Sequence, residues 1–372
     1  MRILLQVLLT VVVFGGTLFA QGTATPPAGK FSGYMMGDYY YNMSRDAGYA
    51  ALANNASSSA APGATAMQSF ILRRVYLTYD NDISEQFTTR FRLEADQGTD
   101  VLTSGKIGVF VKDAYLKWKN IFGGSDLTFG IQPPPTYDVS EAAWGYRSLE
   151  KTIMDLRGIY GSRDVGLSLK GKIVESGMFN YWVMVGKNAG NTPATTNKYN
   201  RYSAQLHVKP LTGLQATLYF DYLDAADKAD PFNKGSFVGN AMSTMALFVG
   251  YAQPNSFNVG LEAFSQSTAN GYTASGATSL SSLSKTGFSG WASVNVTSDI
   301  SVVGRYDNYD PNTNSAAVGD VRNYIIGGVS FKVNKNVSIT PNVLYETYEA
   351  PSGGSAPDAS VTARVTFYFI FL

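Results

Sequence analysis

From Phe31 to the C-terminus the chain alternates apolar and polar residues in segment after segment of about ten residues. A period of two is typical of a β-strand that has one apolar and one polar face. Beyond Phe31 no apolar run is long enough to cross a membrane as a helix, which needs about 20 residues. The pattern therefore predicts a protein that meets lipid with strands.

The last segment shows the alternation most clearly. Its apolar residues share one face of a predicted strand, and they are Val361, Ala363, Val365, Phe367, Phe369 and Phe371. Its polar residues share the other face, and they are Thr362, Arg364, Thr366 and Tyr368. The segment 86–97 likewise gathers Arg90, Arg92, Glu94 and Asp96 on one face. An arginine on the lipid face costs about 2 to 4 kcal/mol at the membrane midplane, so we expect these charges to face an interior.

Sixteen segments follow this pattern, and short connections alternate with long ones. The segments are 31–42, 69–80, 86–97, 107–119, 125–132, 163–173, 178–188, 200–209, 214–224, 241–252, 256–267, 286–297, 300–309, 321–333, 337–348 and 361–372. In hydrocarbon every backbone amide needs a partner, so strands can cross only as a closed sheet. The fold class predicted is all-β, a transmembrane antiparallel β-barrel of about 16 strands. An even strand number with short periplasmic turns places both termini in the periplasm of a bacterial outer membrane.

Composition narrows the function. The 29 basic and 28 acidic residues give a net charge of +1, which disfavours nucleic acid as a partner. With no cysteine and with His207 as the one histidine, the chain has no thiolate site and no multi-histidine metal site. We therefore expect no cofactor and no metal.

The N-terminus has the features of an export signal. Arg2 precedes an apolar run from Ile3 to Phe14, and Ala20 is a small residue suited to cleavage. We expect a signal peptide over 1–20, a flexible periplasmic segment over 21–30 and the barrel over 31–372. A membrane anchor is the alternative for the first segment, although the run is short for a spanning helix.

The longest connection without a strand pattern, 133–162, is the third long loop in chain order. Loops of this length are usually functional. Leu149, Ile153, Met154 and Leu156 need an apolar partner, so we expect the loop to fold into the barrel as a constriction, with a short helix near Leu149 to Leu156. An ordinary surface loop is the alternative.

Two places break strict alternation. Lys112 would face lipid unless a bulge near Lys112 and Asp113 turns it inward, with Val109 and Val111 outward before the bulge. Arg73 and Arg74 are adjacent, so we expect Arg74 inside and Arg73 near the outer surface, where lipopolysaccharide phosphates could pair with it.

Several runs resemble the phosphate-selective porin (O and P type) superfamily. They are Phe70 to Leu77, Arg90 to Asp96, Asp113 to Trp118, Phe129 to Pro133, Tyr146 to Lys151 and Ser162 to Leu167. The likeness is strongest over 70–170. It implies a sixteen-stranded, usually trimeric porin with its third loop in the pore. Phosphate-specific members line the channel with arginines and lysines, whereas this loop sets three acids beside three bases, which argues against phosphate specificity.

We therefore predict passive diffusion of small hydrophilic solutes and ions, with weak anion preference from the wall arginines. The partners expected are outer-membrane lipid, lipopolysaccharide, the solutes themselves and further copies of the chain in a homotrimer. Residues expected at the constriction are Arg74, Arg90, Arg92, Glu94, Asp113, Glu141, Arg147, Glu150, Lys151, Asp155, Arg157, Arg163, Asp164 and Arg364. For Arg147, Glu150, Arg163 and Asp164, a structural role in salt bridges that brace the loop is an alternative of at least equal weight to solute contact.

Two other function classes remain open. An adhesin or structural barrel could use the Tyr-, Ser- and Asn-rich outer loops. A barrel hydrolase would need His207 and Ser203, which share a strand face at i and i−4, and we do not expect an enzyme.

Overall fold

A computed structural model describes residues 29–48, 63–96, 106–193 and 196–372. The expected signal peptide and most of the segment 21–30 lie outside these ranges, and Lys30, placed in that segment, is already the first residue of a strand. Within the described ranges, no helix has the length and apolar character that a helical membrane crossing requires.

Sixteen antiparallel strands close into one barrel, as the alternation predicts. Its strands are β1 (Lys30–Ser44), β2 (Gln68–Asp82), β3 (Phe87–Asp96), β4 (Gly108–Phe122), β5 (Ser125–Gln132), β6 (Asp164–Lys172), β7 (Phe179–Gly186), β8 (Arg201–Leu211), β9 (Leu214–Leu223), β12 (Met242–Gln253), β13 (Phe257–Tyr272), β14 (Ser281–Asn295), β15 (Ile300–Asp310), β16 (Arg322–Asn334), β17 (Val337–Tyr348) and β18 (Ser360–Ile370). β1 pairs with β18 to close the ring, for example at Gly37 opposite Phe367. A two-stranded hairpin, β10 (Lys228–Ala229) and β11 (Phe237–Val238), lies in one connection.

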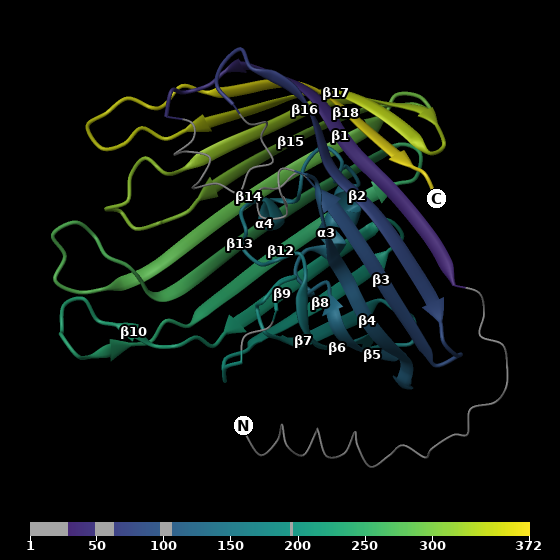
Figure 1. Cartoon of the computed structure of the whole chain (residues 1–372), viewed down its shortest axis with the longest axis horizontal. Coiled ribbons are helices and arrows are strands. Elements are labelled where there is room, and N and C mark those ends of the chain that lie inside the picture. The colour runs from purple at the N-terminus through teal and green to yellow at the C-terminus, as the bar shows by residue number, and fades with distance from the viewer. Residues whose placement is uncertain (1–28, 49–62, 97–105, 194–195) are drawn as a thin grey trace.

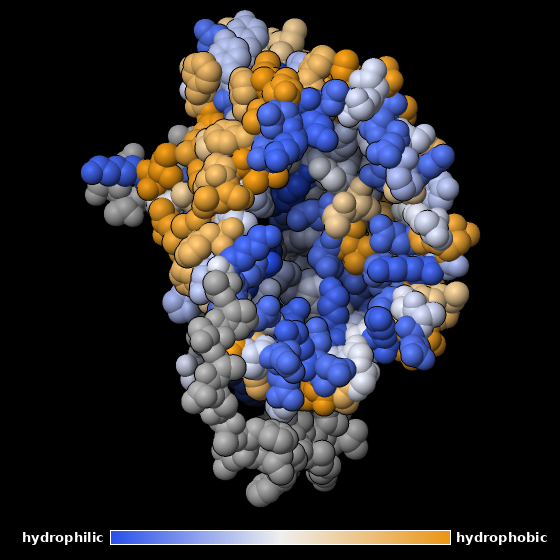
Figure 2. Space-filling model, turned by 90° about the vertical axis from the view of Figure 1, so that its right-hand side faces the viewer, coloured by the Kyte–Doolittle hydropathy of each residue, from blue (hydrophilic) through white to orange (hydrophobic). Residues whose placement is uncertain are grey.

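The two ends of the barrel differ in their connections. Short turns such as 123–124, 212–213 and 335–336 lie at one end, and long loops lie at the other (Figure 1). The connection predicted over 268–285 is shorter than expected, because β13 and β14 continue to pair to Tyr272 and Ser281. Figure 2 faces the short-turn end and shows a hollow with hydrophilic residues around it, and apolar residues on the outside of the ring.

Side-chain direction follows the predicted alternation. In β18, Thr362, Arg364 and Thr366 are buried inside the barrel, whereas Phe367 is 41% exposed on the outer surface. The outer surface also carries exposed tyrosines near strand ends, such as Tyr251 and Tyr222. The interior is thus polar and the exterior apolar, which is the arrangement of a membrane barrel.

Two bulges turn adjacent pairs of polar residues into the lumen. In β4, Arg92 pairs with Asp113 and Leu93 with Val111, so Lys112 is the extra residue, as the sequence predicts. In β2, Met36 pairs with Arg74 and Gly37 with Leu72, so Arg73 is extra. Both Arg73 and Arg74 therefore face the lumen.

The prediction that Arg73 lies near the outer surface is wrong. Strict alternation would force one of two adjacent residues outward, but a bulge inserts one residue without a cross-strand partner and lets both point the same way. Arg73 forms an ion pair with Asp38 on β1. It is not available to lipopolysaccharide phosphates.

The third long connection, 133–163, folds into the barrel. It contains two short helices, α3 (Asp138–Trp144) and α4 (Ile153–Leu156). Both lie inside the ring of strands (Figure 1), and α3 and α4 contact β13 and β14 respectively. The short helix expected near Leu149 to Leu156 is α4, whereas α3 was not anticipated.

Candidate functional site

The loop 133–163 packs against one side of the lumen through apolar side chains. Trp144, Leu149 and Leu156 are buried in a cluster with aromatic and aliphatic residues of five strands. The wall residues of this cluster are Phe248, Trp291, Val303, Tyr324, Ile326 and Leu344. Trp144 lies edge-on to Trp291, with ring centroids 5.8 Å apart. We call this region, where the loop meets β12 to β18, the packed side of the lumen.

Polar contacts fix the same side. The backbone carbonyl of Leu149 accepts a 2.7 Å hydrogen bond from Arg364 on β18, and Arg73 on β2, beyond β1, donates a second one at 3.3 Å. Arg157 pairs with Glu346 on β17 at 2.9 Å, and both side chains are nearly inaccessible to solvent. Charged groups in a low-dielectric interior attract strongly only when both are present, so such pairs define one position for the loop.

Two further hydrogen bonds tie loop side chains to the packed-side wall. Ser140 donates a 2.7 Å hydrogen bond to Glu262 on β13. Tyr324 on β16 donates one of 3.0 Å to Glu150. The loop is therefore held in α3 through Ser140 and just before α4 through Glu150.

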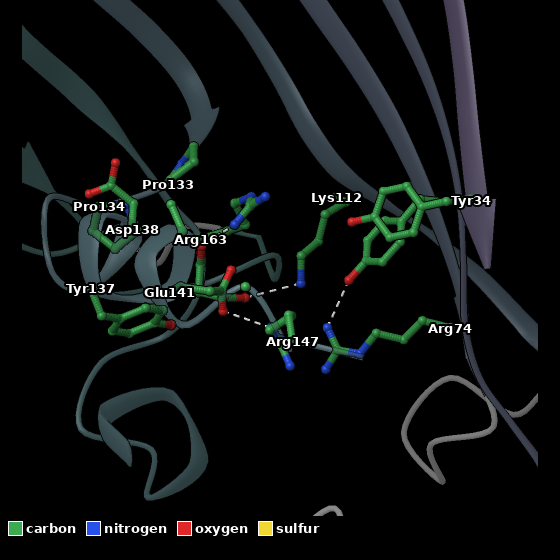
Figure 3. Close-up of a pocket in the computed structure, with 14 residues that line it drawn as sticks. Tyr34, Arg74, Lys112, Pro133, Pro134, Tyr137, Asp138, Glu141, Arg147 and Arg163 are labelled. Carbon is green, nitrogen blue, oxygen red and sulfur yellow. Dashed lines mark hydrogen bonds and ion pairs between the residues drawn. The ribbon is translucent and has the colours of Figure 1, made fainter. Parts of the chain in front are cut away.

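The opposite side of the lumen is open. A cavity of about 300 Å³ lies between the loop and β1, β2 and β4. Its lining residues include Tyr34, Arg74, Tyr76 and Lys112 from the wall, and Pro133, Pro134, Tyr137, Asp138, Glu141, Arg147, Ser162 and Arg163 from the loop (Figure 3). We call this cavity the constriction and this region the open side.

The wall charges at the constriction form two ion-paired groups. Glu94 on β3 pairs with Arg74 at 3.2 Å and with Lys112 at 2.8 Å. Asp113 pairs with Arg92 at 3.3 Å and with Arg163 of the loop. Each buried carboxylate thus holds two basic side chains.

The loop carries a third ion-paired group. Arg147 contacts Glu141 at 2.7 Å and Asp155 at 2.9 Å. Burial raises the pKa of the Glu141 carboxyl, although Arg147 acts in the opposite direction. Glu141 therefore gains a proton at a higher pH than an exposed glutamate does.

Basic groups are the more accessible members of the wall groups. The Arg74 and Arg92 side chains are each 17% exposed, whereas those of Glu94 and Asp113 are 1% exposed. The bases therefore stand between these acids and the passage. Among the described residues that line the cavity, Glu141 and Asp138 of the loop are the accessible acids, with side chains 32% and 34% exposed. These charges create an electric field across the passage, and its positive end is at the wall.

The fourteen predicted constriction residues fall into four groups. Those that line the constriction or belong to the ion-paired groups around it are Arg74, Arg92, Glu94, Asp113, Glu141, Arg147, Asp155 and Arg163. Those that anchor the packed side are Glu150, Lys151, Arg157 and Arg364, with Lys151 accepting a hydrogen bond from Arg305 through its carbonyl. Arg90 lies in a separate cavity nearer the short turns, paired with Asp80 at 2.7 Å. Asp164 is fully buried and accepts hydrogen bonds from the backbone of Asn188 and Ala189.

The prediction balanced three acids against three bases in the loop, but these residues do not together set the charge of the constriction. Glu150 and Arg157 pair with the packed-side wall, so neither contributes charge to the cavity. Among the described residues that line it, four are basic (Arg74, Lys112, Arg147, Arg163) and two are acidic (Asp138, Glu141).

Sequence reasoning missed several residues of the site. Tyr34 and Tyr76 line the cavity, although neither is among the predicted constriction residues. Lys112 lines it too, and the break in alternation was the signal for its inward direction. Arg305 and Asp307 form a buried pair beneath the loop. Their i, i+2 spacing on one strand face could have revealed this.

The residues of the hydrolase alternative lie away from the constriction. His207 on β8 forms a 3.1 Å hydrogen bond with Gln215. Ser203 is buried at 5% exposure, four residues earlier on the same strand. In the described part of the chain, no group of three or more His, Cys, Asp or Glu residues is arranged to hold a metal ion.

Solved structures with the same architecture include an anion-selective porin and an outer membrane channel. The anion-selective porin from Comamonas acidovorans matches with a TM-score of 0.65 and 12% identity, over 92% of this chain and 99% of that chain. The fold is that of the outer-membrane porins. OprB of Pseudomonas putida matches with a TM-score of 0.62 and 10% identity, over 92% of this chain and 94% of that one.

The outer membrane channel DcaP of Acinetobacter baumannii also has this porin fold. It matches with a TM-score of 0.62 and 12% identity, over 95% of this chain and 99% of that chain. No family model matches the chain, and no curated protein matches it by sequence. At such low identity the likeness concerns the porin fold alone.

Proposed function

We propose that the protein is an outer-membrane porin that lets small hydrophilic solutes and ions diffuse passively. The observation that carries this proposal is the open side of the lumen, where the loop leaves a charged cavity instead of filling the barrel. Further cavities of about 330 Å³ and 340 Å³ lie toward the long-loop end and the short-turn end. Arg163 lines both the outer cavity and the constriction, which supports a continuous polar path.

Weak anion preference is part of this proposal. Four basic and two acidic described residues line the constriction, and the deepest acids lie behind bases. An ion passing this ring meets a net positive sign, which favours anions. The acids reduce the preference, because Glu141 faces the same passage.

Planar-bilayer recordings test both statements. The purified protein is expected to give stepwise conductance in KCl, and a protein that inserts without conductance would defeat the porin proposal. In a KCl gradient, the reversal potential is expected to show modest anion preference. A cation-preferring potential would overturn the selectivity alone.

We also propose membership of the phosphate-selective porin (O and P type) superfamily without phosphate specificity. The runs Phe70 to Leu77 and Arg90 to Asp96 support membership, and the acids among the bases argue against a phosphate ladder. Phosphate is expected to reduce the chloride current no more than sulfate does at equal ionic strength. Much stronger block by phosphate would contradict this.

The resemblance further supports a homotrimer. The N-terminal residue pattern supports an export signal over 1–20, and the even strand number supports periplasmic termini. Native mass spectrometry in detergent is expected to give a mass of three mature chains. The N-terminal sequence of the mature protein tests cleavage after Ala20. Protease treatment of intact cells tests the side on which the termini lie.

A further inference from the structure

Three tyrosines from neighbouring strands form an aromatic row on the lumen wall beside the constriction. The Tyr34 ring on β1 lies 4.8 Å from the Tyr76 ring on β2 and 5.7 Å from the Tyr368 ring on β18. Aromatic side chains are costly to leave against water, so a row of them in a polar lumen calls for a reason. We call these three residues the tyrosine row.

Tyr34 is the member of this row that both lines the constriction and is partly exposed, since Tyr368 is half-buried but is not among the lining residues. Tyr76 is 5% exposed, because Tyr34 covers it on one side and the Arg92 guanidinium lies 5.7 Å from its ring centroid. Tyr34 is half-buried and lines the constriction, with its hydroxyl directed toward the cavity in Figure 3. A planar ring that enters the cavity therefore meets Tyr34 first.

Two arginines from opposite sides of the constriction lie next to this row. Arg74 extends from the wall and Arg147 from the loop, and their guanidinium groups point toward one another in Figure 3. Arg74 contacts both Tyr76 and Glu94 through Nη1. Within the described residues this leaves its Nε and Nη2 for a solute, and an arginine has five donors in all.

Arg147 pairs with Glu141 through Nε and with Asp155 through Nη2, so within the described residues its Nη1 remains for a solute. An anion between the two guanidinium groups would therefore accept from Nε and Nη2 of Arg74 and from Nη1 of Arg147. A carboxylate accepts paired hydrogen bonds from an arginine in a planar, bidentate arrangement. The cavity thus offers a flat aromatic surface at one edge and a two-arginine anion site at the other. A solute that satisfies both must carry a planar ring and a carboxylate on one small frame.

We propose that the constriction binds small aromatic carboxylates, with the ring against Tyr34 and the carboxylate between Arg74 and Arg147. This inference rests on the proposed pore function and names a class of solute for it. An aromatic pair contributes beyond its buried area, and that contribution depends on the planarity of the ring. The site therefore discriminates between benzoate and cyclohexanecarboxylate, which have equal charge and similar size.

Block of the KCl current measures this discrimination. For the unmodified protein, the half-blocking concentration of benzoate is expected to be about three- to tenfold lower than that of cyclohexanecarboxylate. Neutral benzamide is expected to block more weakly than benzoate. Equal block by the two carboxylates would overturn the aromatic part of the proposal, and equal block by benzamide would overturn the ionic part.

The chain offers a matched pair of control positions. Tyr115 and Arg90 also lie side by side in the lumen, but in the cavity nearer the short turns. Tyr34→Leu is expected to bring the ratio of the two half-blocking concentrations close to one, whereas Tyr115→Leu should keep it. Arg74→Gln should weaken benzoate block more than Arg90→Gln does. Loss of the ratio in Tyr115→Leu, or its retention in Tyr34→Leu, would contradict the proposed site.

Calorimetry on the detergent-solubilised protein separates this inference from the pore proposal. Benzoate is expected to release or absorb more heat with the unmodified protein than with Tyr34→Leu, even where no current is measured. Conductance without benzoate binding would overturn the inference alone. Benzoate binding without conductance would overturn the pore function alone. Heat-modifiable migration in gels confirms that each variant has folded.

Discussion

The loop 133–163 divides the lumen into two sides that differ in what occupies them. On the packed side, Trp144 and Leu149 are fully buried against wall residues such as Ile326, and the charges there pair out of reach of water. On the open side, Arg74 and Arg147 line a cavity and remain partly accessible. One side therefore fixes the loop, and the other sets the field that a passing solute meets.

The division separates stability from selectivity in the same loop. Substitutions on the packed side should change folding and pore size, because they remove apolar contacts or leave a charge unpaired. Substitutions of single wall arginines on the open side should change ion preference with a smaller effect on folding, because each buried carboxylate there keeps a second basic partner. Four experiments test how sharp this separation is.

The largest effect is expected from Trp144→Ala. Removing a fully buried tryptophan costs about 3 to 5 kcal/mol, because a cavity replaces the side chain. The midpoint of denaturant unfolding in detergent should fall, and single-channel conductance should rise as the loop loosens. Trp118→Ala is the control, since Trp118 packs on Phe87 and lies outside the loop. Unchanged conductance in Trp144→Ala would show that the packed side does not position the loop.

A smaller loss is expected from Arg157→Met. This change leaves Glu346 buried without its partner, at a cost of about 3 kcal/mol. The double variant Arg157→Met with Glu346→Leu should regain much of that loss, because no unpaired charge remains. The unfolding midpoints of the single and double variants measure this. A double variant less stable than the single one would contradict the electrostatic explanation.

On the open side, Arg74→Gln should reduce anion preference without a comparable loss of stability. One unit charge interacts with an ion about 4 Å away by about 1 kcal/mol in water, so the permeability ratio should fall by up to about fivefold. Arg90→Gln should change it less, since Arg90 is paired with Asp80 in the other cavity. Reversal potentials in a KCl gradient provide the measurement. Equal effects of the two substitutions would mean that the constriction does not govern selectivity.

The smallest effect is expected from pH. Burial raises the pKa of Glu141, with Arg147 opposing the shift, so Glu141 becomes neutral earlier than an exposed glutamate as pH falls. Loss of its negative charge should increase anion preference by roughly twofold or less, because Arg147 already offsets that charge. Reversal potentials measured as pH is lowered should show this rise, and Glu141→Gln should flatten it. A fall in anion preference on acidification would contradict the role given to Glu141.

The barrel could be predicted because its physical constraint acts on every strand. Lipid outside and water inside impose period two on each segment, and the apolar face of β18 is visible in the sequence as alternate residues from Val361 to Phe369. The ends of β13 and β14 could not be predicted, because pairing continues to Tyr272 and Ser281 beyond the segments where alternation was counted. The inward loop was predictable from the apolar residues it must bury, such as Leu149 and Ile153.

The charge arrangement of the constriction was harder to predict. Arg157 and Glu150 are the same residue types as Arg147 and Glu141. Their partners, however, lie on β16 and β17, more than a hundred residues away in the chain. Nothing local distinguishes a charge that braces the loop from one that faces solute. The prediction for Arg73 failed for another reason. A strand with one inserted residue still alternates normally before and after the insertion, so the sequence pattern does not reveal the bulge.

The bulges at Arg73 and Lys112 have a consequence for how such a chain can change over time. Each adds one inward cation while the lipid-facing residues on both sides keep their positions. Gain or loss of a single codon at these points would therefore alter the ions that the interior attracts and leave the membrane-facing belt intact. Transport preference and membrane insertion can thus evolve independently in β2 and β4.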